Sequence, residues 1–263
     1  MPKLNRLAAF VVLIALLPLN LYAQTAEQKG LAIEKAAEEY DNGFIDFSAN
    51  MKMTLKNKSG DTSTRYIRIK TLEVVGDGDK SLSIFDEPAD VKGTAMLTYS
   101  HGLETDDQWL YLPALKKVKR INSRNKSGPF MGSTFAFEDL GSQELEKYSY
   151  RFIREEACGD WQCNVIERIP RYEHSGYTSQ ILWRDQQAHR IVKVDYYDRK
   201  KSLLKTLETG NFQQYLGHYW RPGSMEMVNH LTGKSTLLEW SDYQFQTGVS
   251  ERDFRSQALK RFQ

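Results

Sequence analysis

The feature that most constrains the fold is a strict alternation of apolar and polar residues that begins after residue 44. The apolar members are Ile45, Phe47, Ala49, Met51, Met53 and Leu55, and every residue between them is polar. A period of two places all the apolar side chains on one face of an extended strand and the polar ones on the other. The segment is therefore predicted to be one strand of a sheet with one buried face.

Short segments of similar character follow along the rest of the chain and are separated by turn residues. They lie at 65–74, 82–85, 94–99, 108–112, 116–121, 151–157, 164–169, 178–183, 191–197, 203–207, 219–228 and 235–240. We expect some ten or eleven of these segments to pair as strands joined by tight turns, which favours an antiparallel sheet that is large enough to curl. A curled sheet with one apolar face must be filled by side chains or by a ligand.

Three segments are predicted to be helical. In residues 25–41, Thr25 and Gln28 can form a capping box ahead of apolar residues at helical spacing. Residues 138–147 and 251–262 are predicted to form shorter helices. The expected fold class is mainly β (α+β), with one strongly curved antiparallel sheet of about 10–11 strands and the helices on its concave side.

The first 23 residues have the pattern of a secretory signal peptide. Lys3 and Arg6 precede the apolar run from Leu7 to Leu17, and Ala23 offers a small residue for cleavage. The run is too short to span a bilayer comfortably, although an uncleaved segment would act as a membrane anchor. We expect residues 1–23 to be cleaved, which leaves 24–263 as a single exported domain because no linker divides it.

The charge balance argues against nucleic acid as a partner. The full chain has 36 basic and 34 acidic residues, and removal of Lys3 and Arg6 with the signal peptide leaves 34 of each. A formally neutral chain lacks the excess of positive charge that nucleic-acid binding requires.

The only two cysteines, Cys158 and Cys163, flank a turn sequence between two segments that are predicted to be strands. In an oxidising compartment they are expected to form a disulfide that closes a hairpin. A redox role would favour the tighter C-x-x-C spacing, and a zinc site lacks further ligands.

The sequence contains no recognisable catalytic motif. Its five histidines are scattered, and nucleophile-elbow, zinc-protease, phosphate-loop and dinucleotide patterns are absent from it. The adjacent carboxylates Glu138–Asp139 and Glu155–Glu156 are interpreted as solvated pairs or a helix start, because neighbours on a strand face opposite sides. We therefore predict no catalytic residue, metal or cofactor, and an envelope hydrolase is the least favoured hypothesis.

Residues 109–140 combine a basic run with an apolar cluster. The basic residues are Lys116, Lys117, Lys119 and Arg120, and the apolar cluster, punctuated by glycine and proline, contains Phe130, Met131, Phe135 and Phe137. The cluster is interpreted either as a flap over an apolar ligand or as part of the core. The basic run is interpreted either as an edge strand protected by lysines or as a docking patch for anionic headgroups or an acidic partner.

Several blocks taken in order resemble the outer-membrane lipoprotein-sorting protein family, which is related to the periplasmic carriers LolA and LolB. The blocks are Pro88, Asp90–Ala95, Trp109–Leu115, Arg120–Ile121, Phe130–Ser133, Glu138–Leu140, Tyr196–Asp198, Lys205–Leu207 and Phe254–Leu259. The resemblance covers nearly all of the chain after residue 23. It implies a half-open antiparallel barrel with helices as a lid over a hydrophobic cavity, and carriage of lipids or acylated proteins through the periplasm of a Gram-negative cell.

The leading hypothesis is thus a non-enzymatic, monomeric periplasmic carrier of an amphiphile. Residues expected to line the cavity or form its flap are Phe47, Met51, Met53, Trp109, Tyr111, Phe130, Met131, Phe135, Phe137 and Trp183. Lys116, Lys117, Lys119 and Arg120 are expected to dock a headgroup or partner. The alternative is an accessory or docking module of an inner-membrane exporter of the resistance-nodulation-division (RND) type or of an envelope complex. The family resemblance also implies such an exporter as a partner of the carrier.

Overall fold

The computed structural model describes residues 24–261, so the predicted signal peptide at residues 1–23 lies outside the described part. The described residues form fifteen strands. They are β1 (Asp46–Lys56), β2 (Thr62–Leu72), β3 (Lys80–Glu87), β4 (Ala95–Tyr99), β5 (Asp107–Leu112), β6 (Lys117–Arg120), β7 (Tyr148–Cys158), β8 (Trp161–Pro170), β9 (Ser179–Asp185), β10 (Ile191–Tyr197), β11 (Leu203–Gly210), β12 (Gln213–Tyr215), β13 (Tyr219–Arg221), β14 (Ser224–Asn229) and β15 (Lys234–Phe245). The prediction of a mainly β chain is confirmed.

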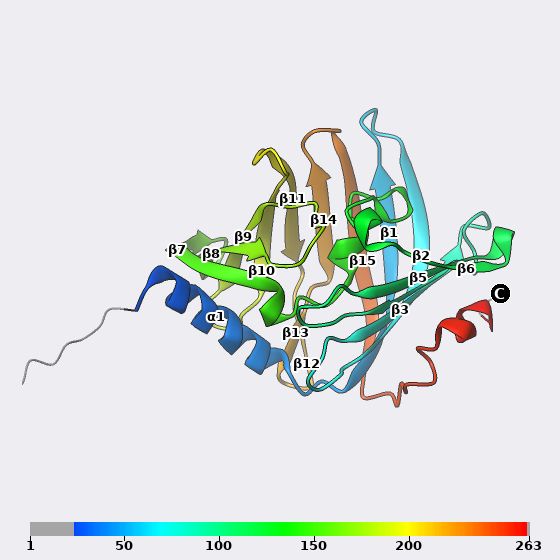
Figure 1. The fold of residues 1–263 in the computed structure, drawn as a ribbon, viewed down its shortest axis with the longest axis horizontal. Coiled ribbons are helices and arrows are strands. Elements are labelled where there is room, and N and C mark those ends of the chain that lie inside the picture. Colours follow the sequence, from blue (N-terminus) through cyan, green and yellow to red (C-terminus); the bar gives the residue numbers. More distant parts are fainter. Residues whose placement is uncertain (1–23, 262–263) are drawn as a thin grey trace, which may run out of the picture.

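Thirteen of these strands form one antiparallel sheet in the order β6-β5-β4-β3-β2-β1-β15-β14-β11-β10-β9-β8-β7, and β12 pairs with β13 in a separate hairpin. Figure 1 shows the main sheet strongly curved, with β6 and β7 at its two edges. The sheet is larger than the ten or eleven strands predicted. The predicted strand at 219–228 is divided at Pro222, because proline cannot donate a hydrogen bond to a sheet ladder.

The alternating segment becomes β1, which lies near the centre of the sheet between β2 and β15. Its register with β2 runs without interruption from Asp46 opposite Leu72 to Lys56 opposite Thr62. Met53 on β1 is buried, whereas Asn50 is exposed. The period of two thus assigns one side of β1 to the core, as the sequence predicts.

The helix predicted at 25–41 is present as α1 (Ala26–Asp41), and its predicted capping box is formed by Thr25 and Gln28. The other two predicted helices are shorter and of 3-10 type: η4 (Phe137–Leu140) and η5 (Leu145–Lys147) replace the first, and η6 (Ser256–Arg261) replaces the second. The remaining 3-10 turns are η1 (Pro113–Leu115), η2 (Ser123–Asn125) and η3 (Phe130–Gly132). Among residues 24–261, no helix has the length and apolar character needed to cross a membrane.

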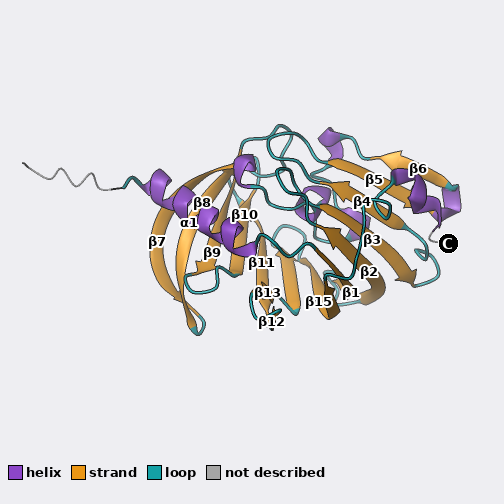
Figure 2. Cartoon of the chain, turned by 90° about the horizontal axis from the view of Figure 1, so that it is seen from below, coloured by secondary structure: helices purple, strands orange, loops and turns teal. Residues whose placement is uncertain are grey.

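The sheet has two covered faces. We call inner the face that carries the largest apolar cluster, which includes Met53, Phe85 and Leu182. This face is covered by η3 and η4. Ile84, next to Phe85 on β3, faces the opposite way and belongs to a second cluster with Phe254 from the C-terminal segment. Figures 1 and 2 show α1 at the β7 end and the C-terminal turn at the β6 end. The C-terminal turn therefore covers the outer face, unlike the predicted arrangement with all helices on one side.

Candidate functional site

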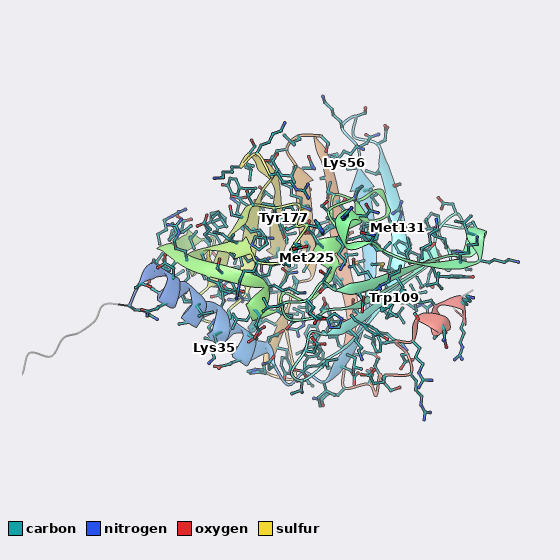
Figure 3. All side chains as sticks on the ribbon, in the orientation of Figure 1. Lys35, Lys56, Trp109, Met131, Tyr177 and Met225 are labelled. Atoms are coloured by element: carbon teal, nitrogen blue, oxygen red, sulfur yellow. A yellow bond between two sulfur atoms is a disulfide. The ribbon has the colours of Figure 1, made fainter. Side chains whose placement is uncertain are left out.

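A cavity of about 1060 Å³ lies on the inner face. Its walls are α1, the strands from β7 to β11 with β14, and the segment 135–146 that contains η4 and η5. Residues from 42–47 and 71–81, at the start of β1 and around the β2–β3 turn, also contribute to the lining. Met225, one of its apolar lining residues, lies near the middle of the molecule in Figure 3. The volume is at the upper end of the range of roughly 300–1,000 Å³ that is typical of small-molecule sites.

The register of the strands builds two parallel rows of side chains beneath this cavity. The first row is polar and crosses five strands by direct pairing: Tyr150, Arg168, Gln180, Tyr196 and Lys205. The second row lies two residues further along each strand and is apolar: Ile166, Leu182, Val194 and Leu207. Directly paired residues of antiparallel strands point to the same face, so both rows face inward.

Arg168 occupies the middle of the polar row and is only 4% exposed. Its Nε donates to the side-chain oxygen of Gln180 at 2.6 Å, and its guanidinium lies 4.5 Å from the centre of the Tyr148 ring. Among the ion pairs of residues 24–261, none involves Arg168. The Arg168 side chain lines the cavity, so a buried positive charge faces the space in which a ligand would lie.

The α1 wall is fixed to the sheet by a buried ion pair. Glu34 of α1 accepts two hydrogen bonds from Arg184 of β9, at 2.7 Å from Nε and 2.6 Å from Nη2. Gly30 permits the close approach of the helix, since a Cβ there would lie 2.8 Å from the backbone nitrogen of Phe152. α1 therefore packs closely against β7 at Gly30 and is held over β9 by the ion pair between Glu34 and Arg184.

The opposite wall contains two buried carboxylates, Glu138 and Asp139, on the 3-10 turn η4. Asp139 pairs with Nζ of Lys205 at 2.7 Å and accepts from the hydroxyl of Tyr177 at 2.8 Å. Glu138 accepts three hydrogen bonds from residues 172–176, and its burial raises its pKa. Of the two interpretations of this pair, the structure supports a helix start and not a solvated pair, because Glu138 and Asp139 lie buried in the first turn of η4.

Only some of the sequence-predicted ligand residues meet at the cavity. Phe47 and Phe135 line it. Five others belong to the inner apolar cluster beside it and pack against one another: Met51, Met53, Phe130, Met131 and Phe137.

Three predicted ligand residues lie away from the cavity, which corrects their assignment. Trp109 and Tyr111 belong to the outer cluster, whereas Leu110 between them belongs to the inner cluster. Trp183 follows Leu182 on β9 and therefore points outward, where Nζ of Lys193 lies 4.3 Å from its ring centre. Because successive residues of a strand point to opposite faces, a difference of one position places each of these side chains on the outer face.

The predicted docking residues lie at the β6 edge of the sheet. Lys116, Lys117, Lys119 and Arg120 are all exposed on or beside β6, which is an edge strand. Arg120 pairs with Asp107 of β5.

The predicted Cys158–Cys163 disulfide is present, with 5.9 Å between the Cα atoms, and closes the β7–β8 hairpin.

The end of the cavity nearest β3 is acidic, and Asp79 is its most perturbed group. Burial, together with the nearby Glu144, raises the pKa of Asp79 from 3.8 to about 7. The folded state then holds this proton more tightly than the unfolded chain, so the free energy of unfolding falls as the pH rises from about 4 to 7.

We expect Asp79→Asn to remove this pH-dependent loss while keeping an oxygen that accepts from the Val74 N–H. The variant should be more stable than the native protein by on the order of 2 kcal/mol at pH 8 and about equal to it near pH 4. Urea unfolding at both pH values measures the difference, with Asp160→Asn in the exposed β7–β8 turn as the control. A gain that is the same at both pH values would contradict the assignment.

Comparisons with known proteins agree with this fold. A family model described as an uncharacterized protein family matches residues 77–261. A solved structure from Vibrio parahaemolyticus, described as an outer membrane lipoprotein-sorting protein domain, shares 54% identity with a TM-score of 0.88, and the match covers 89% of this chain and 99% of that one. A DUF1329 family protein from Desulfovibrio piger shares 28% identity with a TM-score of 0.85, over 89% and 99% of the two chains.

The likeness extends to a LolA superfamily protein from Nitrosomonas europaea, with 22% identity, a TM-score of 0.69 and coverage of 89% and 98%; this match concerns the fold alone. None of the curated proteins matches the chain. The curved antiparallel sheet with a cavity on its inner face places the protein in the LolA-like class of folds. The chain belongs to the outer-membrane lipoprotein-sorting protein family, as the sequence blocks predicted.

Proposed function

We propose that the protein is a non-enzymatic periplasmic carrier that binds the acyl chains of a lipid or lipoprotein in the inner cavity and moves this cargo through the envelope. The observation that carries the proposal is the cavity of about 1060 Å³ with apolar residues from neighbouring strands along its floor. Burial of an acyl chain contributes roughly 0.8 kcal/mol per CH₂, so a dozen methylenes supply substantial binding energy without a dedicated polar site.

In this proposal residues 24–263 act as one exported, monomeric domain after cleavage of the signal peptide. The sheet serves as a half-barrel whose concave side is the cargo face, and α1 with the segment 130–147 covers that face. Phe47, Phe135, Leu207 and Met225 contact the acyl chain, since they line the cavity. The role of an RND-type inner-membrane exporter would be to deliver or accept the cargo.

The test is extraction of lipids from protein purified from its native periplasm without detergent, followed by mass spectrometry. We expect a stoichiometric lipid or acylated peptide. Met225→Trp, which fills the cavity, should reduce the bound lipid at least about fivefold, because the indole occupies the space of the chain. Leu203→Trp is the matched control, since Leu203 lies on β11 away from the cavity and is 37% exposed. An empty native protein that also binds no added lipid would overturn the proposal.

A second candidate is a docking module of an RND-type exporter or an envelope complex. It is favoured by the exposed lysines of the β6 edge, since Lys116, Lys117 and Lys119 form no ion pair with any residue among 24–261. Unpaired cations on an edge strand can attract an acidic partner surface. Charge reversal at Lys117 and Lys119 should then abolish assembly while leaving the amount of bound lipid unchanged.

A further inference from the structure

The electrostatic exception on the inner face is Arg168. Three of the other four buried cations among residues 24–261 pair with a carboxylate: Lys147 with Asp106, Arg184 with Glu34, and Lys205 with Asp139, at 2.6, 2.6 and 2.7 Å. The fourth, Lys126, lies outside the inner cavity and donates to the backbone carbonyl of Asp106. Arg168 is as buried as these residues, yet among residues 24–261 it forms no ion pair. Glu34 is the carboxylate with the largest electrostatic effect on Arg168, and it is already bound by Nε and Nη2 of Arg184.

An uncompensated guanidinium is costly to keep in a folded protein. Burial removes its hydration, and an aromatic ring such as that of Tyr148 returns only part of the lost energy. Nε is satisfied by Gln180, but neither Nη1 nor Nη2 has a hydrogen-bond partner within the described part of the chain. Because Arg168 lines the cavity, these two groups can be satisfied from the cavity itself. A planar fork with both terminal nitrogens available is suited to bidentate binding of a carboxylate or a phosphate.

The immediate neighbours of Arg168 add donors rather than acceptors. Gln180 and Tyr196 follow it in the polar row, and both line the cavity. The oxygen of Gln180 is occupied by Arg168, which leaves its amide N–H groups, and the Tyr196 hydroxyl has no partner among the described residues. The hydroxyls of Tyr148 and Tyr150, in contrast, already donate to Gln143 and to the Leu145 carbonyl at 2.6 and 3.1 Å. The free groups therefore favour an acceptor that carries negative charge.

The apolar row begins two residues away from these donors. Val194 lies two residues from Tyr196 on β10, and Leu207 is its direct partner on β11. Met225 of β14 and Phe47 of β1 continue the apolar lining away from Arg168. The site thus has a cationic polar end over β8–β10 and an apolar path over β11, β14 and β1.

We propose that the cargo is an amphiphile with an anionic head, a carboxylate or a phosphate, and that the Arg168 guanidinium binds this head while the chain lies along Val194, Leu207 and Met225. The proposal rests on the carrier function and assigns its cargo class and orientation. Gln180 and Tyr196 donate further hydrogen bonds to the head.

The test compares three probes that share one chain: dodecanoate, dodecyl phosphate and the neutral dodecanol, titrated below their aggregation concentrations into delipidated full-length mature protein. We expect Arg168→Met to weaken binding of one or both anions by 10- to 100-fold and to change dodecanol affinity less than threefold. Comparison of the two anions identifies whether carboxylate or phosphate is the preferred head. Arg168→Lys should recover part of the affinity, because it keeps the charge without the planar fork.

The variants also separate a binding role from a structural one. Removal of an unpaired buried charge is expected to leave Arg168→Met at least as stable as the native protein in urea. Tyr196→Phe removes a single hydroxyl and should weaken only anion binding, by about threefold to tenfold. This measurement tests the head-binding site independently of the arginine variant. Equal losses for all three probes, or no loss for the anions, would refute the anionic-head proposal. If the native protein binds none of the three, dodecanol included, it is the carrier function that fails.

Discussion

Glu34→Gln is expected to lower the free energy of unfolding by about 3 kcal/mol, because it breaks a buried ion pair by removing one partner only. Arg184 would remain buried on β9 with a neutral amide in place of a carboxylate that now accepts hydrogen bonds at 2.6 and 2.7 Å. Glu34 itself is 5% exposed, so water cannot restore the lost solvation. Urea unfolding at pH 7 measures the change.

The same helix supplies the matched control. Glu39 pairs with Lys35 at 3.7 Å, but both side chains are more than 60% exposed, so Glu39→Gln should cost less than about 0.5 kcal/mol. The double variant Glu34→Leu with Arg184→Met removes both charges and is expected to recover most of the loss. A loss for Glu34→Gln no greater than that for Glu39→Gln would show that the pair does not hold α1 on the sheet.

The consequence for function follows from the position of α1. The helix forms one wall of the cavity and is attached through Gly30 at β7 and through Glu34 at β9. Gly30 sets the distance of approach, and the ion pair sets the position of the helix across the strands. A helix that lies loosely over the sheet would open the cavity to water and weaken retention of an acyl chain.

The features that were predictable from the sequence are those with local causes. The alternation in β1, the capping box at Thr25 and the hairpin between Cys158 and Cys163 each depend on residues within a few positions of one another. The pairing of β1 with β15 was not predictable, because it joins segments almost 190 residues apart and no local signal specifies the partner. The 3-10 turns that replaced two predicted helices were stabilised by tertiary contacts rather than by helical periodicity.

The candidate site was not predictable from the sequence, because the register of the paired strands brings its residues together. Arg168, Gln180 and Tyr196 are 12 and 16 residues apart along the chain and match no motif, yet direct strand pairing places them side by side. Their alignment depends on β-strand register, in which a shift of one residue exchanges the two faces. Trp183 illustrates the effect: an aromatic residue in the right strand points outward because Leu182 occupies the inward position.

The sequence left open whether Phe130 belongs to a flap or to the core, and Phe130→Ala distinguishes the two. The side chain is 2% exposed and its ring lies 5.9 and 5.6 Å from the rings of Phe85 and Phe137. Truncation of a core phenylalanine leaves a cavity and costs about 3–5 kcal/mol. We therefore expect Phe130→Ala to lower the free energy of unfolding by about 3–4 kcal/mol, as measured by urea denaturation.

The control is Tyr66→Ala on β2, an aromatic residue that is 47% exposed and should cost less than about 1 kcal/mol. Polar contacts also fix this segment, since Nζ of Lys205 donates to the Thr134 carbonyl at 3.1 Å and the Thr134 N–H donates to Oγ1 of Thr236 at 3.0 Å. A flap that opens for cargo would have to break these bonds and expose Phe130. If Phe130→Ala costs no more than Tyr66→Ala, the segment is a flap; a loss of several kcal/mol means that residues 130–137 belong to the core.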